Sequence, residues 1–163
     1  MSITDNPIGR VVYVNARVID PATNLDMIGG VLTDGEKIVD FGPGYAKPDG
    51  HYGKADVVDC EGACLVPGLV DMRVQLREPG EEHKGTLKSA GLAATAGGIT
   101  SMVCLPNTNP VTDDMSVVEF VARRARLLGL SKVYPYGAIT KGLLGSDMAE
   151  MGMLKEAGAV AFT

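Results

Sequence analysis

The pattern of apolar and polar residues changes near Val66. Before that point, short apolar runs alternate with turn residues, which is typical of an all-β protein. These runs predict strands over residues 10–20, 29–33 and 37–41 and one or two more within 55–66. Gly35 lies in the turn between the second and third runs and favours a hairpin there. We therefore expect residues 1–66 to form a small all-β module.

After Pro67, strand patterns alternate with helix patterns. The predicted strands cover residues 68–76, 99–105, 132–137 and 159–163, and the predicted helices cover 84–96, 113–128 and 147–157. This alternation favours right-handed βαβ units and a parallel sheet. A closed barrel of this class has eight strands in about 250 residues. The prediction for residues 67–163 is therefore an α/β fold, the first half of a (β/α)8 TIM-type barrel, with a complete small open α/β domain as the alternative.

Composition narrows the classes of partner. The chain of 163 residues is 45% hydrophobic and 21% charged, which fits a soluble globular protein. Its net charge of -5 gives no basic footprint, so we expect no nucleic-acid partner. Apolar runs stay well short of the roughly 20 residues that cross a bilayer, and residues 1–10 do not have the pattern of a secretory signal. We therefore expect no membrane partner and a cytoplasmic location, with Cys60, Cys64 and Cys104 reduced and buried.

Two motifs follow predicted strands. Residues 66–80 read VPGLVDMRVQLREPG, and residues 94–110 read ATAGGITSMVCLPNTNP. The first resembles the opening barrel strand of the amidohydrolase superfamily, PGxxDxHxH, with the REPG loop of dihydroorotases. The second resembles the dihydroorotase signature that ends in PNTxP. The resemblance extends over essentially the whole chain. It implies a barrel whose N-terminal β module is one part of a composite β-sandwich.

The resemblance also implies a chemistry. In dihydroorotases, the interconversion of dihydroorotate and N-carbamoyl aspartate belongs to pyrimidine biosynthesis and depends on zinc. Histidines two apart on a strand share a face and can grip one metal ion, which activates a bound water. By the same resemblance, Arg77 matches the arginine that binds the substrate carboxylate, and Asn107 matches the asparagine that helps to hold it.

The metal positions depart from the family pattern. Arg73 and Gln75 stand where the two histidines belong. A guanidinium has no lone pair to give to a metal, and an amide oxygen is a weak ligand for zinc. We therefore expect no catalytic residue and no metal ligand in this chain, and zinc that is absent or incompletely held. The resemblance then implies a noncatalytic homologue that still binds dihydroorotate or carbamoyl aspartate if the site survives, forms a homo-oligomer and acts as a structural partner of aspartate carbamoyltransferase.

Several alternatives remain open on the sequence. The protein could be an active zinc-dependent dihydroorotase with ligands beyond residue 163, or a related cyclic amidohydrolase such as allantoinase. Locally, Arg77 and Glu78 could form a solvated loop pair. Asn107 could be a turn residue ahead of Pro110.

Overall fold

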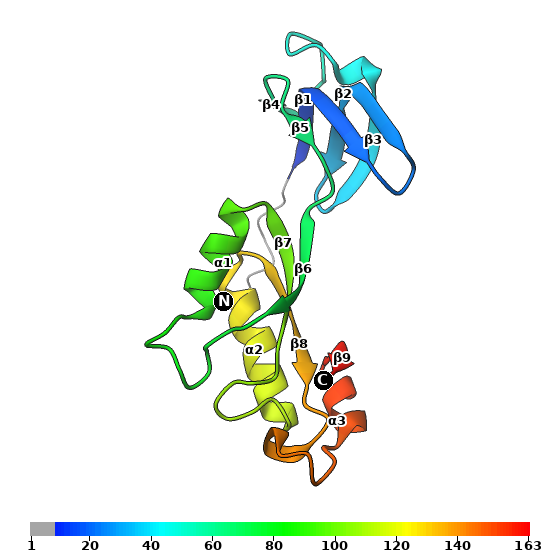
Figure 1. The fold of residues 1–163 in the computed structure, drawn as a ribbon. Helices are drawn as coiled ribbons and strands as arrows, with labels where there is room; N and C mark the ends of the chain where they lie inside the picture. The colour runs from blue at the N-terminus through cyan, green and yellow to red at the C-terminus, as the bar shows by residue number, and fades with distance from the viewer. Residues whose placement is uncertain (1–8) are drawn as a thin grey trace. The chain divides into compact units, whose positions relative to one another are not determined.

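The chain divides into two compact units, Met1–Pro67 and Gly68–Thr163 (Figure 1). The computed structural model describes residues 9–163. Each unit has its own sheet, so each is described by itself.

The first unit is a five-stranded sheet. Its strands are β1 (Arg10–Asp20), β2 (Leu25–Asp34), β3 (Lys37–Gly42), β4 (Asp56–Asp59) and β5 (Cys64–Leu65), and a short 3-10 helix covers Pro43–Tyr45. The strand order is β3-β2-β1-β4, with β5 also paired to β1. β2 runs antiparallel to β1 and β3, whereas β4 and β5 run parallel to β1. A small core of Ala16, Val18 and Val31 lies in this unit.

Two glycines let backbone segments approach β2 closely. A Cβ atom added to Gly30 would lie 2.0 Å from the carbonyl oxygen of Tyr13, and one added to Gly29 would lie 2.3 Å from that of Gly42. Neither distance leaves room for a side chain, so β2 depends on glycine at both positions.

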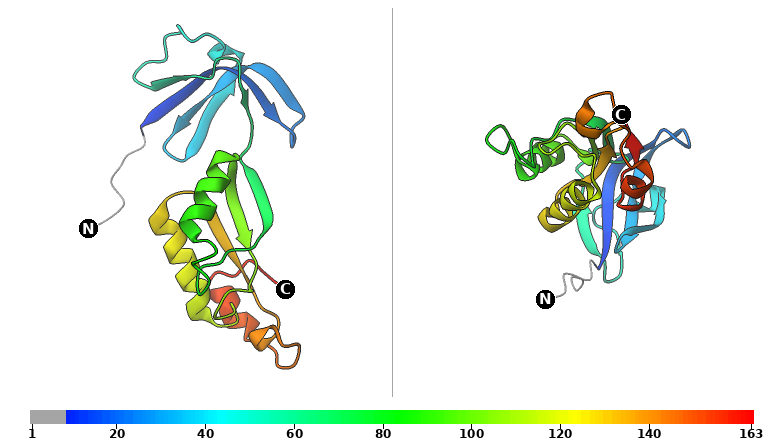
Figure 2. Two further views of the ribbon diagram at one scale, coloured as in Figure 1. Left: turned by 60° about the vertical axis from the view of Figure 1, so that its left-hand side comes forward. Right: turned by 90° about the horizontal axis from the view of Figure 1, so that it is seen from below.

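The second unit is a curled sheet of four parallel strands in chain order. These are β6 (Leu69–Val74), β7 (Ile99–Cys104), β8 (Lys132–Gly137) and β9 (Ala161–Phe162). The helices are α1 (Leu87–Ala96), α2 (Met115–Leu128) and α3 (Met151–Glu156), with a 3-10 turn at Lys141–Leu143. Helices α1 and α2 cover one face of the sheet (Figure 2). The predicted α/β class, with strand and helix alternating, is confirmed.

The core of the second unit lies between this sheet and its helices. One cluster of buried side chains consists of Leu76, Leu87, Cys104 and Val121. A second cluster, near α3, consists of Val118, Ala149, Leu154 and Ala159. Helix α2 contributes to both clusters, through Val121 in the first and Val118 in the second.

Helix α1 begins three residues later than the sequence pattern predicts. Thr86 caps it, because its hydroxyl accepts a hydrogen bond from the Ser89 amide at 3.1 Å and the Ser89 hydroxyl accepts one from the Thr86 amide at 2.9 Å. This reciprocal capping box defines the first turn, so Lys84 belongs to the preceding loop.

Helix α3 is shorter than predicted at its start. Thr140 and Met148 form an isolated antiparallel bridge, and the carbonyl oxygen of Asp147 accepts a hydrogen bond from the Lys141 amide at 2.8 Å. These contacts keep residues 147 and 148 outside the helix, which begins at Met151.

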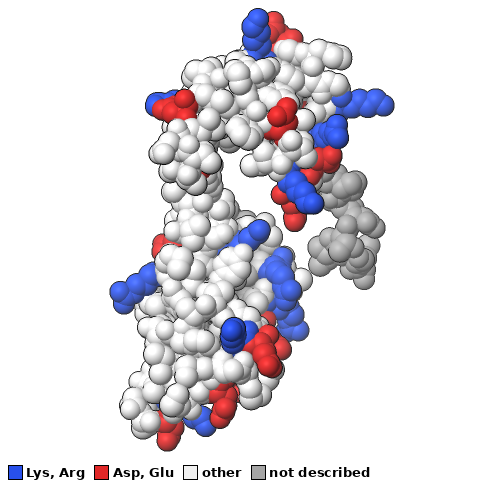
Figure 3. All heavy atoms as spheres, turned by 90° about the vertical axis from the view of Figure 1, so that its right-hand side faces the viewer, with Lys and Arg blue, Asp and Glu red and all other residues white. Residues whose placement is uncertain are grey.

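The surface has both signs of charge. Lys and Arg side chains alternate with Asp and Glu across the face drawn in Figure 3, with uncharged surface between them. Within residues 9–163, no helix is long and apolar enough to span a membrane. The three cysteines are free; the predicted burial is right for Cys104 and wrong for Cys64, which is exposed, while Cys60 is half-buried.

Candidate ligand site after strand β6

Arg73 and Gln75 lie at the carboxyl end of β6. Arg73 is the fifth residue of the strand and Gln75 directly follows its end, and both are exposed. The Arg73 amide donates to Asp71 Oδ1 at 3.0 Å, so Asp71 holds the backbone at this point. Arg73 also lines a surface hollow together with Tyr136, whose hydroxyl donates to the Met72 carbonyl oxygen at 3.1 Å.

Arg77 is held by two side chains of its own loop. Its Nη1 donates to Glu81 Oε2 at 2.9 Å, and its Nη2 donates to Gln75 Oε1 at 3.1 Å. Glu81 Oε1 in turn accepts from the Lys84 ammonium. The hydrogen bond from Lys84, and after it the one from Arg77, lowers the pKa of Glu81 below its ordinary value. The side chain of Arg77 remains 33% exposed, so it is not sealed from solvent.

These residues do not fit a zinc ion at the end of β6. The guanidinium of Arg73 has no lone pair. Of the two family positions, only Gln75 offers a side-chain lone pair, on its amide oxygen, and that oxygen accepts a hydrogen bond from the Arg77 guanidinium. Within residues 9–163, no cluster of three or more His, Cys, Asp or Glu side chains is placed to hold a metal ion. The donor set at the two family positions thus suits an anion better than a cation.

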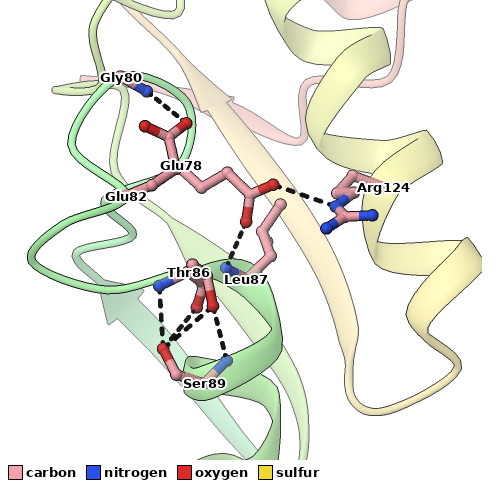
Figure 4. A network of polar contacts seen from close by, with 7 residues as sticks. All are labelled: Glu78, Gly80, Glu82, Thr86, Leu87, Ser89 and Arg124. Atoms are coloured by element: carbon pink, nitrogen blue, oxygen red, sulfur yellow. Dashed lines mark hydrogen bonds and ion pairs between the residues drawn. The ribbon is translucent and has the colours of Figure 1, made fainter.

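Glu78 is buried, which the sequence did not indicate. It is 6% exposed, and its two carboxylate oxygens accept from the Leu87 amide at 2.8 Å and from Arg124 Nε at 3.0 Å (Figure 4). Glu78 therefore ties the loop after β6 to the first residue of α1 and to α2. The alternative of a solvated Arg77–Glu78 pair is wrong, because the two side chains bind different partners.

Asn107 lies in the loop after β7. Its Oδ1 is buried and accepts no hydrogen bond from residues 9–163. This loop touches the loop after β6, since the Asn109 amide donates to the Pro79 carbonyl oxygen at 3.1 Å. Gly80, with φ of 96°, allows the approach, because a Cβ there would lie 1.8 Å from the carbonyl oxygen of Asn109. The structure thus brings the two loops that carry Arg77 and Asn107 side by side.

Sequence reasoning missed Glu81 and Arg124. Glu81 lies four residues after Arg77, a spacing that signals an ion pair in a helix, but no helix was predicted there. The Glu78–Arg124 pair joins residues 46 apart, and nothing in a single sequence points to it.

The family model and the similar proteins of known name point to the same family. The dihydro-orotase-like family matches residues 62–163. The dihydroorotase of Anaplasma phagocytophilum is 46% identical over 154 residues, which are 94% of this chain and 34% of that protein. The dihydroorotase of Pelobacter propionicus is 47% identical over 147 residues, 90% of this chain and 34% of that protein. The chain thus spans about a third of the length of these curated relatives.

Solved structures share the fold. The L-hydantoinase (dihydropyrimidinase) of Arthrobacter aurescens superposes with a TM-score of 0.74 at 23% identity, over 93% of this chain and 32% of that one. The D-hydantoinase (dihydropyrimidinase) of a Thermus species gives 0.59 at 18% identity, over 90% and 30%. The coverage of both agrees with the predicted partial barrel. On the family match and the sequence identities, this chain belongs to the dihydroorotase-like family.

Proposed function

We propose that this chain is part of a noncatalytic dihydroorotase-family protein of pyrimidine biosynthesis, which binds a carboxylate ligand at Arg77 and holds no zinc at the end of β6. The observation that carries the proposal is the hydrogen bond from Arg77 Nη2 to Gln75 Oε1. This bond directs the amide oxygen of Gln75, which stands at one of the family's two metal-binding positions, toward the guanidinium of Arg77.

Charge supports the absence of zinc. Arg73 and Arg77 both bring a fixed positive charge to the end of β6, and a zinc ion would add two more in the same place. The ligands of zinc in proteins are neutral imidazoles or anionic carboxylates and thiolates, and none of them adds a positive charge beside the ion. Here the nearby carboxylate of Glu81 is already paired with Arg77 and Lys84.

The proposed ligand, a carboxylate, is inferred from the substrates of the family and from the side chains of Arg77 and Asn107. Dihydroorotate and N-carbamoyl aspartate both carry carboxylates, and a planar guanidinium binds that group with two parallel hydrogen bonds. Asn107 supplies an amide from the adjoining loop, and its buried Oδ1 is an acceptor that a donor of the ligand could satisfy after a small loop movement. We assign the ligand carboxylate to Arg77 and to the side-chain amide of Asn107, whose NH2 group can donate to it.

The partner is proposed from the family alone. Noncatalytic dihydroorotase-like chains act with aspartate carbamoyltransferase, and we propose this enzyme as the partner, within an assembly that contains more than one copy of this protein. A second function, an active zinc-dependent dihydroorotase, is favoured by the 46% identity to a relative of that name. Turnover of dihydroorotate distinguishes the two.

Ligand-induced stabilisation tests the binding half of the proposal. Dihydroorotate at 100 times its Kd should raise the free energy of unfolding of the full-length gene product by about 2.7 kcal/mol. Arg77→Ala should remove the rise, and Arg10→Ala, which removes an exposed arginine of the first unit, should keep it. A wild-type protein that melts at the same temperature with and without dihydroorotate would refute carboxylate binding at this site.

A further inference from the structure

The loop after β6 carries its own carboxylate to Arg77. Glu81 Oε2 lies 2.9 Å from Arg77 Nη1, so it takes one of the guanidinium donors that a ligand carboxylate would use. The Glu81 side chain is 27% exposed and that of Arg77 33%, so the pair is half-buried at the place where the ligand is proposed to bind.

From this contact we infer that Glu81 is an internal competitor that lowers the affinity of the site: it occupies Arg77 in the unliganded protein, and a ligand carboxylate binds Arg77 by displacing it. The inference rests on the proposed carboxylate site. It adds that the affinity of this site is set by an internal competitor as well as by the groups that hold the ligand.

Backbone contacts place Glu81 at Arg77. The Glu81 amide donates to the Arg77 carbonyl oxygen at 2.7 Å, and the Glu81 carbonyl oxygen accepts from the Lys84 amide at 2.8 Å. Gly80, directly before Glu81, is seated against Asn109 of the neighbouring loop. These contacts fix the backbone on both sides of Glu81. The fold of the loop therefore places the Glu81 carboxylate beside the Arg77 guanidinium.

Lys84 makes the exchange feasible. Glu81 Oε1 is bound to the Lys84 ammonium while Oε2 is bound to Arg77. When a ligand takes Arg77, the Glu81 carboxylate therefore keeps a cationic partner and is not left unpaired. Half-exposed ion pairs are weak, which is consistent with a competitor that lowers affinity without blocking the site.

The adjacent glutamate has a different role and provides a matched control. Glu82 Oε1 accepts from the Gly80 amide at 2.9 Å (Figure 4), and Glu82 forms none of the ion pairs found within residues 9–163. Glu81→Gln and Glu82→Gln remove the same charge from neighbouring positions. Glu82→Gln keeps an oxygen for the Gly80 amide, so it leaves the loop intact.

Calorimetric titration of the full-length protein with dihydroorotate tests the inference. Glu81→Gln should bind about twofold to fivefold more tightly than wild type, the range that an exposed ion pair corresponds to, and Glu82→Gln should bind like wild type. Tighter binding is an effect that structural damage does not produce. Glu81→Ala serves as a second variant and should also bind more tightly.

The outcomes separate the two proposals. Binding by wild type with equal or weaker binding by both Glu81 variants would overturn the role of Glu81 and leave the carboxylate site standing. Binding by the Glu81 variants with none measurable by wild type would support the role of Glu81. Binding by none of the folded proteins would overturn the carboxylate site, and the role of Glu81 with it.

Discussion

Arg124 donates from Nε to Glu78 Oε1 across 3.0 Å, and this contact joins helix α2 to the loop that carries Arg77. The Glu78 side chain is 8% exposed and that of Arg124 45%. The second oxygen of Glu78 accepts from the Leu87 amide at the start of α1. One buried carboxylate thus connects the candidate site to two helices of the second unit.

Removal of the Arg124 guanidinium should destabilise the protein. Arg124→Met leaves the buried Glu78 carboxylate with one of its two partners, which should cost about 1–3 kcal/mol of unfolding free energy. Urea unfolding of the full-length protein measures the change. Arg123→Met is the control, because Arg123 is exposed and forms no ion pair within residues 9–163, so its value should stay near that of wild type. Equal values for the two variants would contradict the connecting role of Glu78.

Gly80→Ala should separate the two loops of the site. The added methyl group would lie 1.8 Å from the Asn109 carbonyl oxygen, at a φ of 96° that L-residues rarely adopt. We expect a lower melting temperature and loss of dihydroorotate-induced stabilisation. Gly85→Ala is the control, since the nearest atom to its new methyl group would be 3.8 Å away. Retained ligand stabilisation in Gly80→Ala would show that the contact between the loops does not matter for binding.

Thr86→Ala should weaken the start of α1. The substitution removes the hydroxyl that accepts from the Ser89 amide, and loss of such a cap costs about 1 kcal/mol. Thr86→Ser keeps the hydroxyl and should recover most of this value in the same urea unfolding experiment. Similar losses in Thr86→Ala and Thr86→Ser would assign the effect to the Thr86 methyl group.

Cys104 should be inert to alkylation in the folded protein. It is 2% exposed, and burial raises the pKa of its thiol from 9.0 to about 12. The thiolate that reacts with iodoacetamide is therefore almost absent at pH 8, whereas the exposed Cys64 should react readily. Peptide mapping after a short pulse measures both. Labelling of Cys104 as fast as Cys64 without denaturant would contradict the packing of β7.

The same thiol predicts a dependence of stability on pH. In the unfolded chain the Cys104 thiol ionises near 9.0, below its folded pKa of about 12. Its contribution to stability should therefore be fully present below about pH 9 and decline as the pH rises toward 12. Cys104→Ala should flatten this part of the profile, and an unchanged slope in that variant would assign the decline to other groups.

Much of the fold follows from patterns that the sequence displays. The bounds of β1 and β8 are those of the apolar runs. Helix α2 ends at Leu128, directly before Gly129, which adopts the left-handed conformation that favours glycine. The start of α1 was mispredicted because Ser89 takes the position that Glu or Gln fills in most capping boxes. The ends of strands and helices depend on neighbouring residues, so sequence patterns predict them when the usual residue types are present.

The candidate site was less accessible to such reasoning. The motifs identified Arg73, Gln75, Arg77 and Asn107 as its positions, but not the contacts among them. The bond from Arg77 to Gln75 and the pairing of Glu81 with Arg77 depend on how the loop folds. The hydrogen bond between Glu78 and Arg124 depends on how the loop after β6 lies against α2. Contacts between distant segments require the three-dimensional structure.

Zinc content together with dihydroorotate hydrolysis, measured on the full-length gene product, tests the central claim most directly. The dihydroorotase of Anaplasma phagocytophilum, purified and supplied with zinc in the same way, is the positive control. We predict a folded protein with far less than one equivalent of tightly bound zinc and no turnover above its metal-stripped form. Turnover that is lost on metal removal and restored by zinc would contradict the account and show that the site is built without the residues at the end of β6.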